Sequence, residues 1–297
     1  MLHSTMPVET FTQEFHDESS VREMSYRTLG RTNLHVSELS LGGGPFGGLY
    51  EWGHLRLQNF RIKSIFFKGL KLGINYLDTA PHYGLGRSEK FLGKKGFYIS
   101  TKVGHYDNFF DFSAKSVVIH DIEFAPSLDY IISETIPIDV ILSYSRDTLL
   151  TTIVQVILFL VQNIGVVNAS CTGMGLLSTV GPQTWHPATD HLKEICHKAV
   201  AETLADNVEL GKLAVYFCLQ KIILSSSCLV GMGSTKILKL NLDATFNNIS
   251  DKEKTSFKSY KQSIEWNDSS NEMFTYAVVA FLKRRGSEKK RIFLRRL

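Results

Sequence analysis

Apolar and polar residues follow two patterns along the chain, and together these patterns predict alternating strands and helices. Short apolar runs bounded by glycine, proline or polar residues predict strands at 35–41, 74–78, 97–102, 117–120, 140–145, 166–170 and 228–233. Helical spacing of apolar residues predicts helices at 57–72, 88–93, 126–135, 148–162, 191–204, 209–219 and 235–246. Such alternation is typical of an α/β fold with a parallel sheet.

Three of the predicted strands deliver chemically active side chains at their carboxyl ends. Asp78 ends one strand and Tyr83 follows in the next loop, while Lys102 and His120 end the two strands after it. In parallel α/β folds the active site forms at this edge of the sheet. We therefore expect the four side chains to lie close together.

These residue types fit a proton-transfer centre beside a carbonyl or an alcohol. A tyrosine has a pKa near 10 and is a poor acid or base at neutral pH, but a nearby ammonium stabilises its phenolate. We interpret Tyr83 as the acid/base, Lys102 and Asp78 as the pair that lowers its pKa, and His120 as a group that orients a substrate oxygen. Each residue alone is more often structural, so the combination carries the interpretation.

The stretches NYLDTAPHYGLGRSE and ISTKVG resemble signature stretches of the aldo-keto reductases. YRTLGRTNLHVSELSLGGGPFGG and VIHDIEFA resemble the aldose 1-dehydrogenase branch of that family, and the resemblance runs from about Tyr26 to about Trp266. It implies a (β/α)8 TIM-barrel and a hydride transfer between a nicotinamide and C1 of an aldose, of the L-galactose or D-threo-aldose type, which yields a lactone. It gives catalytic roles to Asp78, Tyr83, Lys102 and His120.

The resemblance also implies a set of cofactor-binding residues: Gly43, Gly44, Ser143, Ser170, Gly231, Gly233, Ser234 and Asn241. A glycine turn before a helix suits a phosphate, because free N–H groups and the helix dipole point at it. NADP needs a basic group for its 2′-phosphate, and near this turn we find only Lys236, so the sequence favours NAD. The formal GxGxxG match at Gly42 is followed by a loop and not a helix, so it is not interpreted as a dinucleotide fingerprint. The resemblance implies that these glycines line the nicotinamide and substrate pocket, and a plain glycine-rich turn is the alternative.

The chain departs from the family pattern in two places. Seventeen residues separate Lys102 from His120, which leaves no room for a crossover helix. Another helix and strand are absent before Val140. We therefore predict an incomplete barrel over residues 26–274, without about one strand and two helices. A catalytically inactive, truncated relative is the alternative.

Charge and composition bear on the partners and the two ends. The net charge is +4, but residues 281–297 carry +7, so the basic balance gives no good case for nucleic acid as the main partner. We expect residues 1–25 to be a disordered extension and 275–297 a solvated basic tail, with attachment of the tail to anionic membranes or to nucleic acid as an alternative.

The remaining features predict a cytosolic protein that acts on a small sugar. The four cysteines form no CxxC pair, which indicates neither a metal site nor a disulfide framework. The N-terminal residues lack the apolar run of a signal peptide. The apolar run at 153–161 is shorter than the roughly 20 residues that cross a bilayer. Oligomeric state is not indicated.

Overall fold

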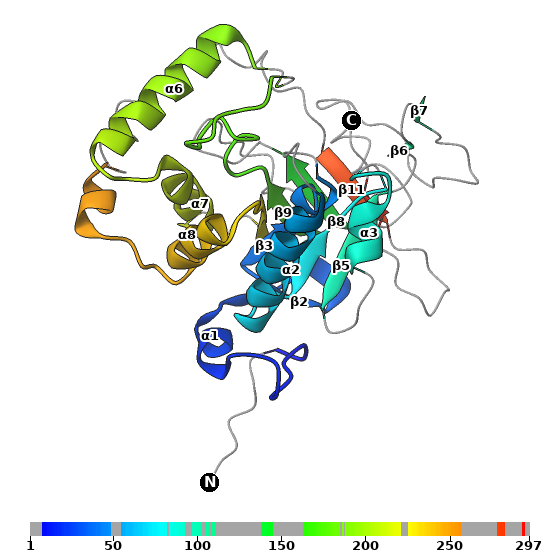
Figure 1. Cartoon of the computed structure of the whole chain (residues 1–297). Coiled ribbons are helices and arrows are strands. Elements are labelled where there is room, and N and C mark those ends of the chain that lie inside the picture. Colours follow the sequence, from blue (N-terminus) through cyan, green and yellow to red (C-terminus); the bar gives the residue numbers. More distant parts are fainter. Residues whose placement is uncertain are drawn as a thin grey trace.

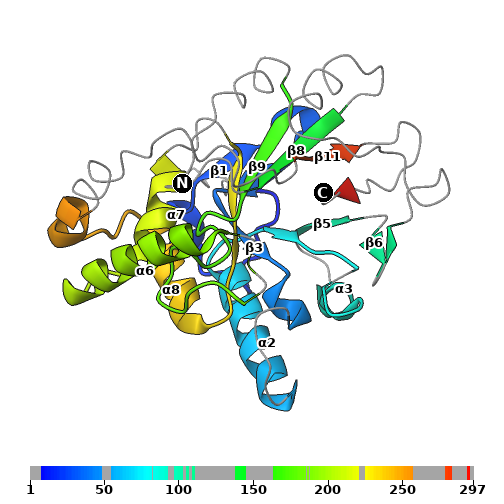
Figure 2. The ribbon, with the colours of Figure 1, turned by 90° about the horizontal axis from the view of Figure 1, so that it is seen from above.

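A curled parallel sheet forms the centre of the molecule (Figures 1 and 2). The computed structural model describes residues 8–48, 55–81, 83–92, 97–102, 105–106, 109–110, 138–144, 163–184, 186, 188–220, 225–256, 278–282 and 293–294. Within this part of the chain, six parallel strands lie in the order β8 (Ile138–Tyr144), β9 (Gly165–Ala169), β10 (Ser227–Gly231), β3 (Leu39–Gly42), β4 (Tyr76–Asp78) and β5 (Tyr98–Lys102). The sheet is a partial (β/α)8 barrel, which confirms the predicted fold class.

Two C-terminal strands lie at the outer edges of this sheet. β11 (Val278–Leu282) pairs antiparallel with β8, and β12 (Phe293–Leu294) pairs parallel with β5. The prediction of a solvated tail is therefore wrong for these residues. The apolar, β-branched sequence VVAFL of β11 suits a sheet position, and pairing satisfies the backbone groups that an edge strand leaves open.

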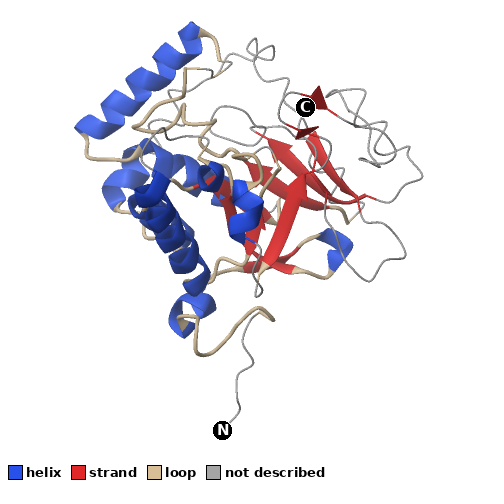
Figure 3. Cartoon of the chain, turned by 45° about the vertical axis from the view of Figure 1, so that its right-hand side comes forward, coloured by secondary structure: helices blue, strands red, loops and turns tan. Residues whose placement is uncertain are grey.

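Helices cover one side of the sheet (Figure 3). They are α2 (Leu55–Lys71), α6 (Asp190–Ala205), α7 (Leu210–Gln220) and α8 (Thr235–Thr245), while the short α3 (Arg87–Leu92) lies apart. Apolar side chains of β3, β4 and β10 pack against α2, α7 and α8 in one core cluster. A second cluster fills the barrel interior with side chains that include Tyr76, Leu142, Val167 and Leu229.

The predicted elements agree with these bounds to within a few residues, except where the structure gives no description. The predicted strand at 117–120 and the predicted helices at 126–135 and 148–162 lie outside the described residues. β6 (His105–Tyr106) and β7 (Phe109–Phe110) form a small antiparallel pair that the sequence did not predict. The described helices include none with the length and apolar character needed to cross a membrane.

The N-terminal residues are folded against the barrel, so the prediction of disorder is wrong for residues 8–25. Asp17 caps the helix α1 (Glu18–Glu23) by accepting a hydrogen bond from the amide of Ser20 at 2.8 Å. The buried side chains of Val21 and Met24 anchor this helix, and the amide of Asp17 donates to the carbonyl of Lys71 at 2.8 Å. The polar composition of the N-terminal residues hid these few apolar side chains, and their burial orders the segment 8–25.

A hairpin closes the amino end of the barrel, formed by β1 (Tyr26–Thr28) and β2 (His35–Ser37) with the short 3-10 helix η1 (Gly30–Thr32) between them. Asn75, just before β4, holds this hairpin in place. Its Oδ1 accepts from the amide of Ser37 at 2.7 Å, and its Nδ2 donates to the carbonyl of His35 at 2.8 Å and to Thr10 Oγ1 at 3.1 Å. The N-terminal segment, the hairpin and β4 therefore share one buried amide.

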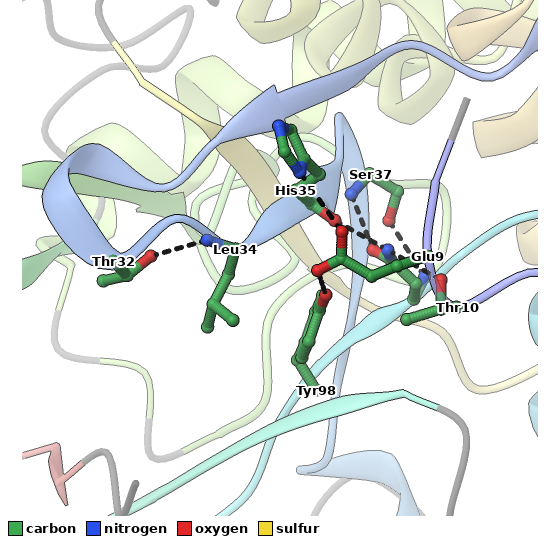
Figure 4. A network of polar contacts seen from close by, with 8 residues as sticks. Glu9, Thr10, Thr32, Leu34, His35, Ser37 and Tyr98 are labelled. Atoms are coloured by element: carbon green, nitrogen blue, oxygen red, sulfur yellow. Dashed lines mark hydrogen bonds and ion pairs between the residues drawn. The ribbon is translucent and has the colours of Figure 1, made fainter.

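Glu9 extends the same polar network to β5 (Figure 4). The hydroxyl of Tyr98 donates a hydrogen bond to the Glu9 carboxylate, and His35 Nδ1 lies 3.4 Å from its Oε2. The Tyr98 hydrogen bond lowers the pKa of Glu9, and His35 adds to this effect. Burial and the neighbouring carboxylate raise the pKa of Tyr98. The network is thus built for neutral pH, with Glu9 ionised and Tyr98 protonated.

Candidate active site

Asp78 lies at the carboxyl edge of the sheet, as the last residue of β4, and its side chain is 2% exposed. Ser100 lies opposite it on β5, and its hydroxyl donates to Asp78 Oδ1 at 3.1 Å. Lys102 ends β5 two residues beyond Ser100. The structure therefore brings Asp78 and Lys102 to the ends of adjacent strands, as the pattern of strand ends predicts.

Tyr83 lies in a tight loop between β4 and α3. Its amide donates to the carbonyl of Ala80 at 3.0 Å, and its carbonyl accepts from the amide of Ser88 at 3.2 Å. The next three residues, 84–86, all have left-handed backbone angles, and Leu85 among them is 63% exposed. A left-handed leucine persists only where its surroundings enforce it. This strained turn fixes the backbone of Tyr83 five residues after Asp78.

The glycine stretch after β3 presses directly against this loop. The amide of Gly43 donates to the carbonyl of Asp78 at 2.6 Å. A Cβ on Gly43 would lie 2.5 Å from that oxygen, and one on Gly47 would lie 2.3 Å from the carbonyl carbon of Tyr83. Gly44 is buried and precedes a 3-10 turn, η2 (Pro45–Gly47). These glycines therefore permit a close backbone approach to the loop that carries Tyr83.

Two hydroxyl groups that sequence reasoning missed join these segments. Thr79 Oγ1 donates to Ser88 Oγ at 2.7 Å, and Ser88 Oγ lies 3.1 Å from the carbonyl of Gly43, to which it donates. Ser100 is a third missed residue. All three lie inside the stretches NYLDTAPHYGLGRSE and ISTKVG, so the signal was present in the sequence. Their hydrogen bonds connect the segments that carry the catalytic candidates, which the residue types alone do not indicate.

His120 lies outside the described residues, and its predicted role stays a prediction. The side chain of Lys102 is likewise not described. Among the described residues, no group of three or more His, Cys, Asp or Glu side chains is arranged to hold a metal.

Three of the cofactor candidates, Gly231, Gly233 and Ser234, lie at the end of β10. Gly231 ends β10 beside the glycine stretch, because it pairs with Gly42 and lies against the ring of Pro45. After Gly233, Ser234 caps α8 by accepting a hydrogen bond from the amide of Ile237 at 3.1 Å. The first turn of this helix thus faces the same edge of the sheet as Asp78.

Asn241 supports the presence of a ligand site at this end. It is 3% exposed, and its buried Nδ2 has no hydrogen-bond partner among the described residues. A buried donor without a partner costs about 1–3 kcal/mol, so proteins rarely keep one unless a ligand or water satisfies it. The residues present therefore fit a cofactor that offers an acceptor to Asn241.

The two serines predicted to contact the cofactor have different positions. Ser170 follows β9 with a left-handed φ of 66°, and its Oγ accepts from the amide of Met174 at 3.0 Å. Ser143 lies on β8 between Leu142 and Tyr144, which pack in the interior cluster. Because side chains alternate along a strand, Ser143 belongs to the opposite face, and the structure does not bring it to Asp78.

The fold and the site define a class of protein before any comparison. Parallel strands, helices on the outer face and polar residues at the carboxyl ends are the features of (β/α)8-barrel enzymes. Among solved structures, the chain resembles an aldo-keto reductase from Bacillus halodurans in its holo form. The TM-score is 0.56 at 21% identity, over 80% of this chain and 96% of that chain. This likeness concerns the fold.

Sequence comparison identifies the family. The chain is 31% identical over 287 residues to L-galactose dehydrogenase from Arabidopsis thaliana, covering 75% of this chain and 88% of the relative. It is 36% identical over 78 residues to D-threo-aldose 1-dehydrogenase from a Pseudomonas species, covering 24% and 22%. No family model matches the chain. The chain belongs to the aldo-keto reductase family, in its aldose dehydrogenase branch. It is an oxidoreductase of the aldo-keto reductase type.

Proposed function

We propose that the chain oxidises an aldose of the L-galactose or D-threo-aldose type at C1 to a lactone, with NAD as the cofactor. The observation that carries the proposal is the placement of Asp78 and Lys102 at the ends of adjacent strands, with Tyr83 in the loop that follows Asp78. The similarity to L-galactose dehydrogenase over most of its length supports the substrate class. The substrate is thus a small sugar, and we propose the cytosol as the compartment.

The proposed mechanism divides the work among these residues. A nicotinamide cofactor held at the carboxyl end of the barrel would supply the hydride acceptor for C1 of the sugar. Tyr83 takes the proton from the anomeric hydroxyl, and Lys102 stabilises the phenolate that Tyr83 needs for this step. Asp78, held by the hydroxyl of Ser100, balances the charge of Lys102. His120 orients the sugar oxygen in this proposal.

The cofactor proposal rests on the end of β10. The backbone of Gly231, Gly233 and Ser234 would hold the phosphates, and Asn241 would donate to the adenine end. Lys236 is exposed in the first turn of α8, whereas Lys239 is paired with Asp243 at 2.7 Å. A single lysine is a weak match for a 2′-phosphate. We therefore expect a higher kcat/KM with NAD than with NADP, and the Lys236→Arg variant should narrow the difference.

The test of the catalytic proposal is Tyr83→Phe. We expect kcat with L-galactose to fall by about 10²–10⁴, because the acid/base is removed, while the Kd for NAD stays unchanged. Tyr98→Phe is the matched control, since it removes a hydroxyl at the other end of the barrel. Full turnover by the Tyr83→Phe variant would exclude the mechanism.

A second candidate is a catalytically inactive aldo-keto reductase that retains a cofactor site. It is favoured by the edges of the sheet, where C-terminal strands and not consecutive βα units lie beside β5 and β8. NAD binding by the wild type without turnover of any aldose in a panel would support this reading.

A further inference from the structure

His186 forms a bridge between two segments of the long connection from β9 to α6. Its side chain is buried at 3% exposure. Nδ1 accepts a hydrogen bond from the amide of Ala188 at 3.0 Å, and Nε2 lies 3.1 Å from the carbonyl of Gly173. A carbonyl can only accept, so Nε2 must carry the proton. Both nitrogens of the neutral ring are therefore used, and the tautomer is fixed by its partners.

The turn that His186 holds begins at Ser170. The carbonyl of Ser170 accepts from the amide of Gly173 at 2.8 Å, and its Oγ accepts from the amide of Met174 at 3.0 Å. Ser170, Gly173 and Met174 all have left-handed backbone angles, with φ of 66°, 59° and 53°. Two of these are not glycine, so the turn is costly by itself and needs support from its surroundings. His186 supplies such support at Gly173.

The surroundings keep the imidazole neutral. Burial lowers the pKa of His186 below its ordinary value, and the positive charge of Lys193 on α6 acts in the same direction. A doubly protonated ring would turn Nδ1 into a donor facing the amide of Ala188 and break that hydrogen bond. The bridge therefore suits a permanent structural link and not a catalytic proton carrier.

We propose that His186 is a positioning residue that holds the Ser170–Met174 turn in the conformation that presents Ser170 to the dinucleotide cofactor. The inference rests on the proposed function, because Ser170 is a predicted cofactor contact. In this proposal His186 acts on the cofactor site indirectly, by holding the turn that carries Ser170, and does not contact the sugar. Loss of the hydrogen bond to Gly173 should therefore weaken cofactor binding more than sugar binding.

Three substitutions separate the two hydrogen bonds. His186→Gln can place an amide N–H near the position of Nε2 and keep the bond to Gly173. His186→Asn can place an oxygen near Nδ1 and keep only the bond to Ala188. His186→Leu keeps neither. We expect the Asn and Leu variants to raise the Kd for NAD about fivefold to tenfold, the size of one net hydrogen bond, and the Gln variant to restore it.

A stability control lies three residues away. Thr189 caps α6 by accepting a hydrogen bond from the amide of Leu192 at 3.3 Å, so Thr189→Ala should lower the Tm without changing the Kd for NAD. Hydrogen exchange at the amides of Gly173 and Met174 gives a readout that needs no cofactor. We expect faster exchange at both in the Leu variant and not in Thr189→Ala.

The outcomes are distinguishable. If the wild type binds NAD and the Asn and Leu variants bind it equally well, the positioning role is wrong and the proposed function stands. If Thr189→Ala weakens NAD binding as much as His186→Leu, the effect is general destabilisation, and the inference is overturned. If the wild type binds neither NAD nor NADP, the proposed function fails, and the cofactor role of His186 fails with it.

Discussion

The two ends of the barrel strands are built in different ways, although the same strands connect them. At the amino end, side chains such as Asn75 and Glu9 join the N-terminal segment and the hairpin to β4 and β5. At the carboxyl end, backbone presses on backbone, with Gly43 and Gly47 against the residues from Asp78 to Tyr83. The amino end is closed by buried polar contacts, and the carboxyl end is a strained backbone arrangement that holds the proposed reacting groups.

This difference suggests that residues at the amino end govern the stability of the barrel, whereas residues at the carboxyl end govern catalysis. Barrel enzymes place their chemistry at the carboxyl ends of the strands and use the amino ends for stability. Substitutions at the amino end of this chain should therefore change the free energy of unfolding and spare kcat. Substitutions at the carboxyl end should lower kcat by more than their effect on stability explains.

The largest expected effect comes from deleting residues 275–297, which contain β11 and β12. The deletion removes five register pairs between β11 and β8 and exposes the edges of β8 and β5. At about 1 kcal/mol for each ladder hydrogen bond, the loss is about 5 kcal/mol, comparable to a typical net stability. Thermal unfolding should become non-cooperative. The contacts at the amino end and those at the carboxyl end of the barrel should both be lost.

Deleting only residues 295–297 is the control for this truncation, because both strands remain. An unchanged melting curve for the longer deletion would show that the C-terminal strands contribute nothing to the barrel.

The next largest effect tests whether the amino end of the barrel contributes to stability and not to catalysis. Asn75→Ala removes the buried acceptor for the amide of Ser37 and the donor to His35 and Thr10. We expect a loss of about 3 kcal/mol in the free energy of unfolding, because buried polar groups lose their partners. Turnover of the folded enzyme should stay within about twofold, since a stability effect of this kind leaves the transition state unchanged. Urea denaturation and steady-state kinetics measure the two quantities.

Asn75→Asp is the matched variant, since it keeps the acceptor for Ser37 but places a buried carboxylate oxygen against the carbonyl of His35, and we expect it to destabilise at least as much as Ala. A large fall in kcat at unchanged stability would break the comparison between the two ends.

Gly47→Ala tests the carboxyl end. Its Cβ would overlap the carbonyl of Tyr83, so either the glycine stretch or the Tyr83 loop must move. We expect about 1–3 kcal/mol of destabilisation from the strain and a fall in kcat of about 10²-fold from the displaced Tyr83. Gly48→Ala is the control: its Cβ meets no atom within 4 Å, and it costs only the left-handed φ of 82°. Equal kcat for both variants would contradict the role of the close contact.

The smallest expected effect concerns Glu9. The lowered pKa of Glu9 means that its ionised form stabilises the fold above its ordinary pKa of 4.5, and that this contribution is lost as the pH falls through the folded value. Glu9 is exposed, so the Glu9→Gln variant should lose about 0.5 kcal/mol or less at pH 7. The difference from the wild type should vanish well below pH 4.5 in denaturation curves. A difference that grows in acid would have the wrong sign.

The sequence by itself determined the parallel α/β class, most element bounds and the residue types at the strand ends. Alternation and helical spacing are local, so they can be read from consecutive residues, and Asp78 and Lys102 came to adjacent strand ends as expected. The family also followed from local stretches, because the signature residues lie close together in the chain.

Only the tertiary structure decided how the open parts of the barrel are covered. Pairing of β11 with β8 joins residues more than a hundred positions apart, and no local pattern indicates a partner at that separation. The same holds for Asn75, which hydrogen-bonds to Thr10, His35 and Ser37. It also holds for Gly47, where the backbone of Tyr83 leaves no space for a side chain. A residue's local sequence fixes its own backbone preference, whereas contacts across the fold decide which atoms it meets.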